Sequence, residues 1–193
     1  MFSRPFWRIA RLACAAALVS AVLALGGCMA KSLAPAVDKQ DRVVDGRLVG
    51  TWLTEDKESA VIESRDSDYV VSYTDKDGKL GSFDARLGRL GSRWVLDLSP
   101  QGSAVVAASD AYKALLLPAH TFLLFDSIGA RIRVSGLKPD SLEAYLERQP
   151  TAVAHVKVED DVVLSAPTAE LRVFLERYVN RPGVLEPEVW TKR

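Results

Sequence analysis

Two cysteines, Cys14 and Cys28, carry the only thiols in the 193-residue chain, and their positions decide what chemistry a thiol could perform. Cys14 lies inside an apolar run near the N-terminus, whereas Cys28 directly follows Leu25-Gly26-Gly27 at the end of that run. The two glycines leave the backbone before Cys28 narrow enough to enter a peptidase cleft.

The apolar run that positions this cysteine has the length of a signal sequence rather than that of a membrane span. Arg4, Arg8 and Arg11 precede it, and the 14 residues 12–25 carry no charge. A spanning helix needs about 20 apolar residues, whereas the apolar region of a signal peptide is shorter. An ordinary secretory signal with an incidental cysteine, or a short membrane anchor, is the alternative interpretation.

Leu25-Gly26-Gly27-Cys28 resembles the lipobox of bacterial lipoproteins. The resemblance implies that residues 1–27 are a signal peptide cleaved between Gly27 and Cys28, so that Cys28 becomes the first residue of the processed chain. It also implies that a diacylglyceryl thioether forms on Cys28 and that an acyl chain such as palmitate caps its N-terminus. Two or more chains hold a protein on a membrane stably, whereas a single chain is marginal. Met29 stands where an aspartate would signal inner-membrane retention, which favours the outer membrane of the bacterial envelope, facing the periplasm.

The charge and the cysteine content of the remaining chain exclude several classes of function. The whole chain has 25 basic and 25 acidic residues, and the leader takes three of the basic ones, so the rest is slightly acidic. Such a balance gives no footprint for a nucleic-acid partner. With Cys28 lipidated, no thiol remains for a disulfide, a catalytic nucleophile or a cysteine metal site. We expect no cofactor.

Residues 48–193 are expected to form a single β-rich globular domain, after a lipidated cysteine and a flexible tether at residues 28–47. Apolar and polar residues alternate in this domain with the period of two that is typical of half-buried antiparallel strands. Turn-forming residues separate the alternating stretches at 65–68, 75–78 and 91–92. The short spacing predicts an antiparallel meander of hairpins that closes into a small barrel.

Two short α-helices are predicted within this mainly β chain, near residues 139–148 and 167–179. Each has an apolar stripe at the spacing of one helix face. A further short helix is expected at 105–117, where Pro118 would end it. The stretch 120–125 is apolar on both faces, so another element should cover its outer side.

Gly50-Thr51-Trp52, at the start of the first predicted strand, resembles the Gly-x-Trp start of the lipocalin family. The resemblance implies a lipocalin-like barrel, which in some bacterial members is an outer-membrane lipoprotein of about this size. Arg131 and Arg133 are the candidates for the late arginine that packs on the tryptophan in that family. The family's Thr-Asp pair in a later loop has no counterpart here. The stretches 89–98 and 117–122 are also similar to a group of small bacterial lipoproteins, which implies no activity.

The function expected from these features is reversible binding. If a small apolar ligand is carried, we predict that it contacts inward side chains of the barrel, namely Trp52, Phe83, Trp94, Leu96, Phe122 and Leu124. Core residues would look identical, and Trp52 in particular is expected to plug one end of the barrel. The alternative is a structural or assembly accessory protein that docks an envelope protein through its outer surface.

Neither histidine predicts a catalytic or metal site. His120 and His155 lie far apart, no third metal ligand is suitably spaced, and each is expected to be a partly buried, hydrogen-bonded side chain. Ser82 and Ser92 lack the Gly-x-Ser-x-Gly turn that exposes a hydrolase nucleophile. Asp97 falls on the outward side of its strand, where we expect solvated surface. We therefore expect no enzyme and no bound metal.

Overall fold

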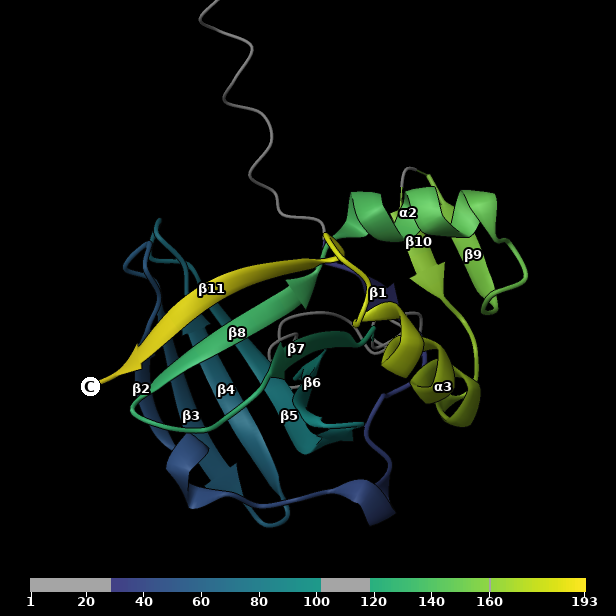
Figure 1. Ribbon diagram of the computed structural model, residues 1–193. Coiled ribbons are helices and arrows are strands. Elements are labelled where there is room, and N and C mark those ends of the chain that lie inside the picture. Colours follow the sequence, from purple (N-terminus) through teal and green to yellow (C-terminus); the bar gives the residue numbers. More distant parts are fainter. Residues whose placement is uncertain (1–28, 102–118, 160) are drawn as a thin grey trace, which may run out of the picture.

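Eight antiparallel strands close into a barrel in the computed structural model, which describes residues 29–101, 119–159 and 161–193 (Figure 1). The order around the barrel is β11-β2-β3-β4-β5-β6-β7-β8, and β8 pairs with β11 to close it. The strands are β2 (Gly50–Leu53), β3 (Ser59–Arg65), β4 (Asp68–Thr74), β5 (Leu80–Leu90), β6 (Arg93–Pro100), β7 (Thr121–Phe125), β8 (Arg131–Leu137) and β11 (Leu185–Lys192). The predicted mainly β fold with a small antiparallel barrel is confirmed.

The hairpin turns follow from the residues that separate the strands. Between β4 and β5, the Asp75 carboxylate accepts hydrogen bonds from the backbone N–H groups of Asp77 at 2.9 Å and Lys79 at 2.8 Å. Gly78 in this turn and Gly91 between β5 and β6 have φ of 78° and 58°, a region that favours glycine. These turns keep sequential strands adjacent, which is the predicted meander.

Strand β11 is the one barrel strand that we did not predict, although it closes the barrel. It pairs with β8 from Leu185 to Thr191, but it meets β2 only through Thr191 and Lys192. Pro187 therefore lies where β11 has a single neighbouring strand, a position that tolerates a residue without an N–H donor. Because proline is uncommon within strands, the sequence pattern at 185–192 does not predict one.

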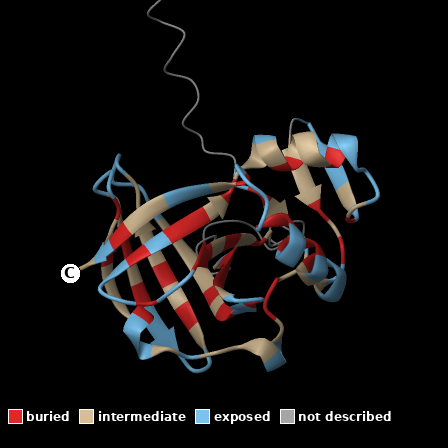
Figure 2. Cartoon of the chain, viewed as in Figure 1, coloured by how far each residue is buried: buried red, intermediate tan, exposed pale blue. Residues whose placement is uncertain are grey.

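Two hydrophobic clusters lie on opposite sides of the barrel wall. Figure 2 shows buried residues both on the barrel strands and on the elements beside the barrel. The first fills the barrel interior and contains the inward residues of the strands, such as Trp52, Leu87 and Leu96. The second lies outside β6 and β7 and joins them to the rest of the chain through residues such as Val95 and Phe122. The outer face of the strand predicted at 120–125 is thus covered, as expected.

The elements that cover this outer face form a small second layer beside the barrel (Figure 1). They are α2 (Pro139–Arg148), α3 (Thr168–Tyr178) and a three-stranded sheet of β1 (Lys31–Ser32), β10 (Asp161–Leu164) and β9 (His155–Val158). Both predicted helices are confirmed. The helix predicted at 105–117 lies outside the described residues. In the described part of the chain, we find no helix that is long and apolar enough to cross a membrane.

The segment before the barrel is packed, which corrects the predicted flexible tether over 28–47 where the structure describes it. It includes β1, η1 (Lys39–Asp41) and η2 (Gly46–Leu48), and Ala36 and Val37 are fully buried. Val37 lies so close to Gly88 of β5 that a Cβ there would be 2.9 Å from its methyl groups. These residues have no regular apolar period, and the sequence therefore predicts a linker. Their burial comes from contact with the folded barrel, which a local pattern does not reveal.

Candidate functional site

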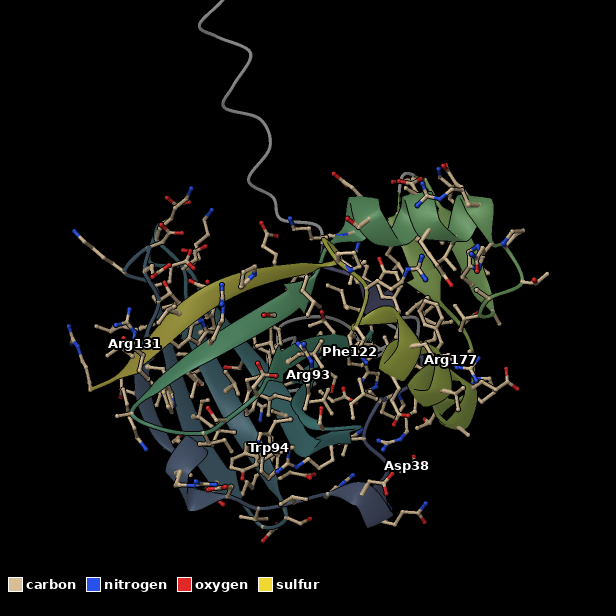
Figure 3. The ribbon with its side chains drawn as sticks, viewed as in Figure 1. Asp38, Arg93, Trp94, Phe122, Arg131 and Arg177 are labelled. Atoms are coloured by element: carbon tan, nitrogen blue, oxygen red, sulfur yellow. The ribbon has the colours of Figure 1, made fainter. Side chains whose placement is uncertain are left out.

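The predicted ligand contacts divide between the two sides of the barrel wall. Trp52, Trp94 and Leu96 belong to the interior cluster, and Phe83 packs against it while partly exposed. Phe122 and Leu124 instead belong to the outer cluster, on the side of β7 that faces α3 (Figure 3), so their predicted place inside the barrel is wrong. Both faces of β7 are apolar, so the alternation could not show which one turns inward.

One end of the barrel is closed around Trp52, whose side chain is fully buried. Its indole Nε1 donates a hydrogen bond to the Leu48 carbonyl oxygen at 2.8 Å, which ties the strand to η2. The ammonium of Lys192 lies 5.4 Å from the ring centroid, within the range of a cation–π interaction. This arrangement is what we expect of a plug rather than of a ligand contact.

Gly50 explains why a glycine stands two residues before this tryptophan. Its φ is +136°, and a Cβ there would lie 2.8 Å from Cε of Lys192. The glycine therefore leaves room for the lysine stem to reach the ring. Arg131 and Arg133, the candidates for a cation on Trp52, are exposed, and Lys192 occupies that place.

At the opposite end of the barrel, the described residues line a pocket of about 430 Å³, which we call the mouth pocket. Its apolar floor includes Leu123, Val134 and Trp190. Its rim carries acidic side chains from the β2–β3 turn and from β11: Glu55, Asp56, Glu58, Glu186 and Glu188. Among the described residues, no lysine, arginine or histidine lines this pocket, so its local charge is negative.

Two hydrogen bonds hold the polar part of the mouth pocket. Trp190 donates through its indole Nε1 to the Glu188 carboxylate at 2.8 Å, and the Tyr73 hydroxyl donates to the Glu58 carboxylate. Partial burial raises the pKa of Glu188 despite the hydrogen bond from Trp190, and nearby Glu58 acts in the same direction. Burial, followed by the Glu58 carboxylate, raises the pKa of Tyr73. These effects favour the uncharged forms of Glu188 and Tyr73.

Asp97 and His120 are buried together outside the barrel wall, which corrects the expectation that Asp97 is solvated. Asp97 is 1% exposed, and its Oδ1 lies 2.6 Å from Nδ1 of His120. Its Oδ2 accepts hydrogen bonds from the backbone N–H groups of Ala36 at 2.6 Å and Val37 at 3.2 Å. The pair therefore fastens the N-terminal segment to β6, and the prediction of a hydrogen-bonded, partly buried His120 is confirmed.

Among the described residues, neither His155 nor a cluster of metal-binding side chains forms a further candidate site. His155 contacts the Val153 carbonyl oxygen through Nδ1 at 3.0 Å. In the part of the chain that the structure describes, no group of three or more His, Cys, Asp or Glu side chains could hold a metal ion. Cys28 and the signal peptide predicted at 1–27 lie outside the described residues, so cleavage and lipidation remain predictions.

Comparisons with known proteins give the chain no family. No protein-family model matches it, and neither a curated protein nor a solved structure does. The fold and the site together define the class of the protein: a closed, eight-stranded antiparallel β-barrel with Trp52 buried toward one end, a pocket at the other, and a layer with two helices on its outer wall.

Proposed function

We propose that the protein is a lipid-anchored component of the bacterial envelope that binds a small amphipathic ligand in the mouth of its barrel. The observation that carries the proposal is the mouth pocket, which has about 430 Å³ of space, an apolar floor and an acidic rim. Pockets that bind small molecules usually have volumes of about 300–1,000 Å³ and combine apolar walls with a few polar groups. Binding here is reversible and needs no covalent step.

The lining of the pocket defines the chemistry of the ligand. An apolar body would lie against Leu123, Val134 and Trp190, where it would lose water. A cationic or hydrogen-bond-donating end would face Glu186 and Glu188 on the rim. A cation beside Glu188 would favour the charged carboxylate, which burial disfavours in the empty pocket. An amine on an apolar chain meets both requirements.

The start of the described chain supports a mouth that faces the membrane. Met29 and Ala30 line the mouth pocket, and Ala30 is buried. A lipid on Cys28 would therefore be attached one residue from the mouth, and two residues of extended chain span only about 7 Å. The anchor we propose would hold the barrel mouth against the outer membrane, where an amphipathic ligand resides.

Quenching of tryptophan fluorescence by a brominated long-chain alkylamine tests the ligand proposal, because Trp190 lies in the pocket. We expect saturable quenching in the wild type. The Leu123→Phe variant narrows the floor and should weaken quenching about tenfold, the change that ~1.4 kcal/mol of lost binding produces. Leu80→Phe, at a residue that is 69% exposed, is the matched control and should behave as wild type. Absence of saturable quenching, or equal quenching in the two variants, would refute the proposal.

The anchor needs a separate test, because ligand binding does not depend on it. We expect intact-mass spectrometry of membrane-extracted protein to give the mass of residues 28–193 plus the acyl groups. The Cys28→Ser variant should lack the lipid and leave the membrane fraction. An unacylated wild-type chain that retains residues 1–27 would disprove the lipid anchor and leave the mouth pocket unaffected.

The edge strand β9 favours a second candidate, the accessory protein that docks an envelope partner. No described strand pairs with the outer side of β9, and Val156 and Val158 are 46% and 55% exposed. An exposed apolar edge can accept a further strand from another chain. Val156→Lys should abolish crosslinking to such a partner while leaving amine quenching unchanged. Crosslinks that persist in the variant would exclude β9 as the contact.

A further inference from the structure

A second pocket lies between α2 and α3. Its volume is about 600 Å³, and its lining comes from both helices and from the 149–154 connection. Three aromatic rings meet at its wall: Tyr145 and Tyr178 at 5.2 Å, and Phe174 and Tyr178 at 5.3 Å between centroids. We call it the interhelical pocket. It shares no residue with the mouth pocket.

The hydroxyl of Tyr178 is the unusual group in this wall. Tyr178 is only 1% exposed, yet its hydroxyl has no hydrogen-bond partner among the described residues. Burial raises the pKa of this hydroxyl to about 12, although the positive charge of Arg181 acts to lower it. Tyr178 itself lines the pocket, together with Arg181 and Tyr145. A buried donor without an acceptor is costly, and a ligand that brings an acceptor would relieve that cost.

The charge of the interhelical pocket is opposite to that of the mouth pocket. Arg177 on α3, labelled in Figure 3, and Arg181 after that helix both line the pocket. Neither arginine forms an ion pair with a described residue. The Arg181 guanidinium lies 4.8 Å from the Tyr145 ring centroid, so it is held over the aromatic wall. Glu170 is the only described acidic residue of the lining. Two guanidinium groups and an unpartnered hydroxyl together suit a carboxylate.

From this cluster we infer that the interhelical pocket binds an aromatic carboxylate. The ring of the ligand packs against Phe174 and Tyr178. Its carboxylate accepts hydrogen bonds from the Tyr178 hydroxyl and from both Arg177 and Arg181. The inference is independent of the function proposed for the barrel mouth, because the two sites differ in position, in charge and in ligand.

Binding of 2-naphthoate to the purified full-length protein, followed by amide chemical shifts and calorimetry, tests the inference. We expect the shifts to map to α2, α3 and the 149–154 connection. The neutral amide 2-naphthamide has the same ring system and should bind at least about tenfold more weakly, since it offers no charge to the arginines. Shifts confined to another surface, no binding, or equal binding of acid and amide would overturn the inference.

Single substitutions separate the groups that the inference uses. Tyr178→Phe keeps the ring and removes the hydroxyl, and it should weaken 2-naphthoate binding about tenfold, as expected for a hydrogen bond to a charged group. Arg177→Gln should weaken binding to a similar degree, whereas Glu170→Gln should strengthen it. Arg148→Gln removes an exposed arginine outside the pocket and serves as the matched control.

If Tyr178→Phe does not fold, the variants at exposed positions, Arg177→Gln and its control Arg148→Gln, still test the inference. Arg177 is exposed, so its replacement leaves the core intact. Equal affinity of Arg177→Gln and Arg148→Gln for 2-naphthoate would refute the inference. Weaker binding in Arg177→Gln alone, together with stronger binding in Glu170→Gln, would support it.

Discussion

Asp97 and His120 face each other across the outer wall of the barrel, with Oδ1 of the aspartate 2.6 Å from Nδ1 of the histidine. The other carboxylate oxygen binds the backbone of the N-terminal segment. His120 also exchanges backbone hydrogen bonds with Ser32, at 2.9 Å and 2.7 Å. A single buried carboxyl group therefore links three parts of the chain that are distant in sequence.

Replacing Asp97 should destabilise the fold more than replacing any exposed aspartate. Asp97→Ala leaves the N–H groups of Ala36 and Val37 without an acceptor inside the protein, and each unsatisfied buried group costs about 1–3 kcal/mol. We expect the free energy of unfolding in urea to fall by roughly 3 kcal/mol. Asp126→Ala, at a side chain that is 74% exposed, should change it by less than about 0.5 kcal/mol. Similar values for the two variants would contradict this role of Asp97.

Gly88 tests whether the N-terminal segment is packed or free. A methyl group at Gly88 would meet both Cγ atoms of Val37 at 2.9 Å and the Asp41 carbonyl oxygen at 3.2 Å. We therefore expect Gly88→Ala to lower the free energy of unfolding by about 1–3 kcal/mol, as overpacking does. Gly46→Ala, where a Cβ would meet nothing within 4 Å, should be neutral or slightly stabilising. A neutral Gly88→Ala variant would mean that residues 37–41 do not rest on β5.

Trp52 should contribute to stability rather than to ligand binding. Trp52→Ala would leave a large cavity at the closed end of the barrel and should cost about 3–5 kcal/mol in urea unfolding. Lys192→Met keeps the stem over the ring but loses the cation–π contact and the hydrogen bond to the Arg47 carbonyl oxygen. We therefore expect the free energy of unfolding to fall by about 1 kcal/mol. If Trp52→Ala abolished alkylamine quenching without lowering stability, the residue would be a ligand contact instead.

The parts of the fold that the sequence predicted well are those in which one physical signal dominates. In β5 and β6, polar residues such as Arg86 and Asp97 alternate with apolar ones, so alternation assigns the inward residues Leu87, Trp94 and Leu96. Helix α3 has four apolar residues on one face, all of which are buried. Local pattern and tertiary burial agree in these elements.

The errors arise where tertiary contacts decide and local pattern does not. Strand β7 is apolar on both faces, so only its pairing with β6 and β8 determines that Phe122 and Leu124 point outward. The local pattern places Asp97 on the outward face of its strand, which predicts a surface residue. Contact with the N-terminal segment buries it instead. Lys192 lies 140 positions after Trp52, and nothing local to either residue shows that they meet. The pockets likewise require the packed structure, because inward residues fill and line cavities alike.

The raised pKa of Glu188 predicts a pH dependence that can be checked in the mouth pocket. Burial raises this pKa in the folded protein, so the folded state holds the proton more tightly than the unfolded chain, whose glutamates titrate near about 4.3. Below that pH Glu188 is neutral in both states. As pH rises through the ordinary value toward the raised one, the unfolded state loses its proton first and the stability contributed by this group is lost.

Glu188→Gln should therefore stabilise the protein at neutral pH and have little effect at acid pH. The glutamine carbonyl can still accept the hydrogen bond from Trp190, so the substitution removes the titration and keeps the contact. We expect the urea midpoint of the variant to exceed that of the wild type at pH 7 and to match it near pH 3.5. Glu186→Gln, on the exposed part of the same rim, should show a smaller difference at pH 7. A gain of equal size at both pH values would show that the effect comes from packing. It would also show that ionisation of Glu188 does not destabilise the folded protein, so that a cationic ligand would have no such cost to reduce.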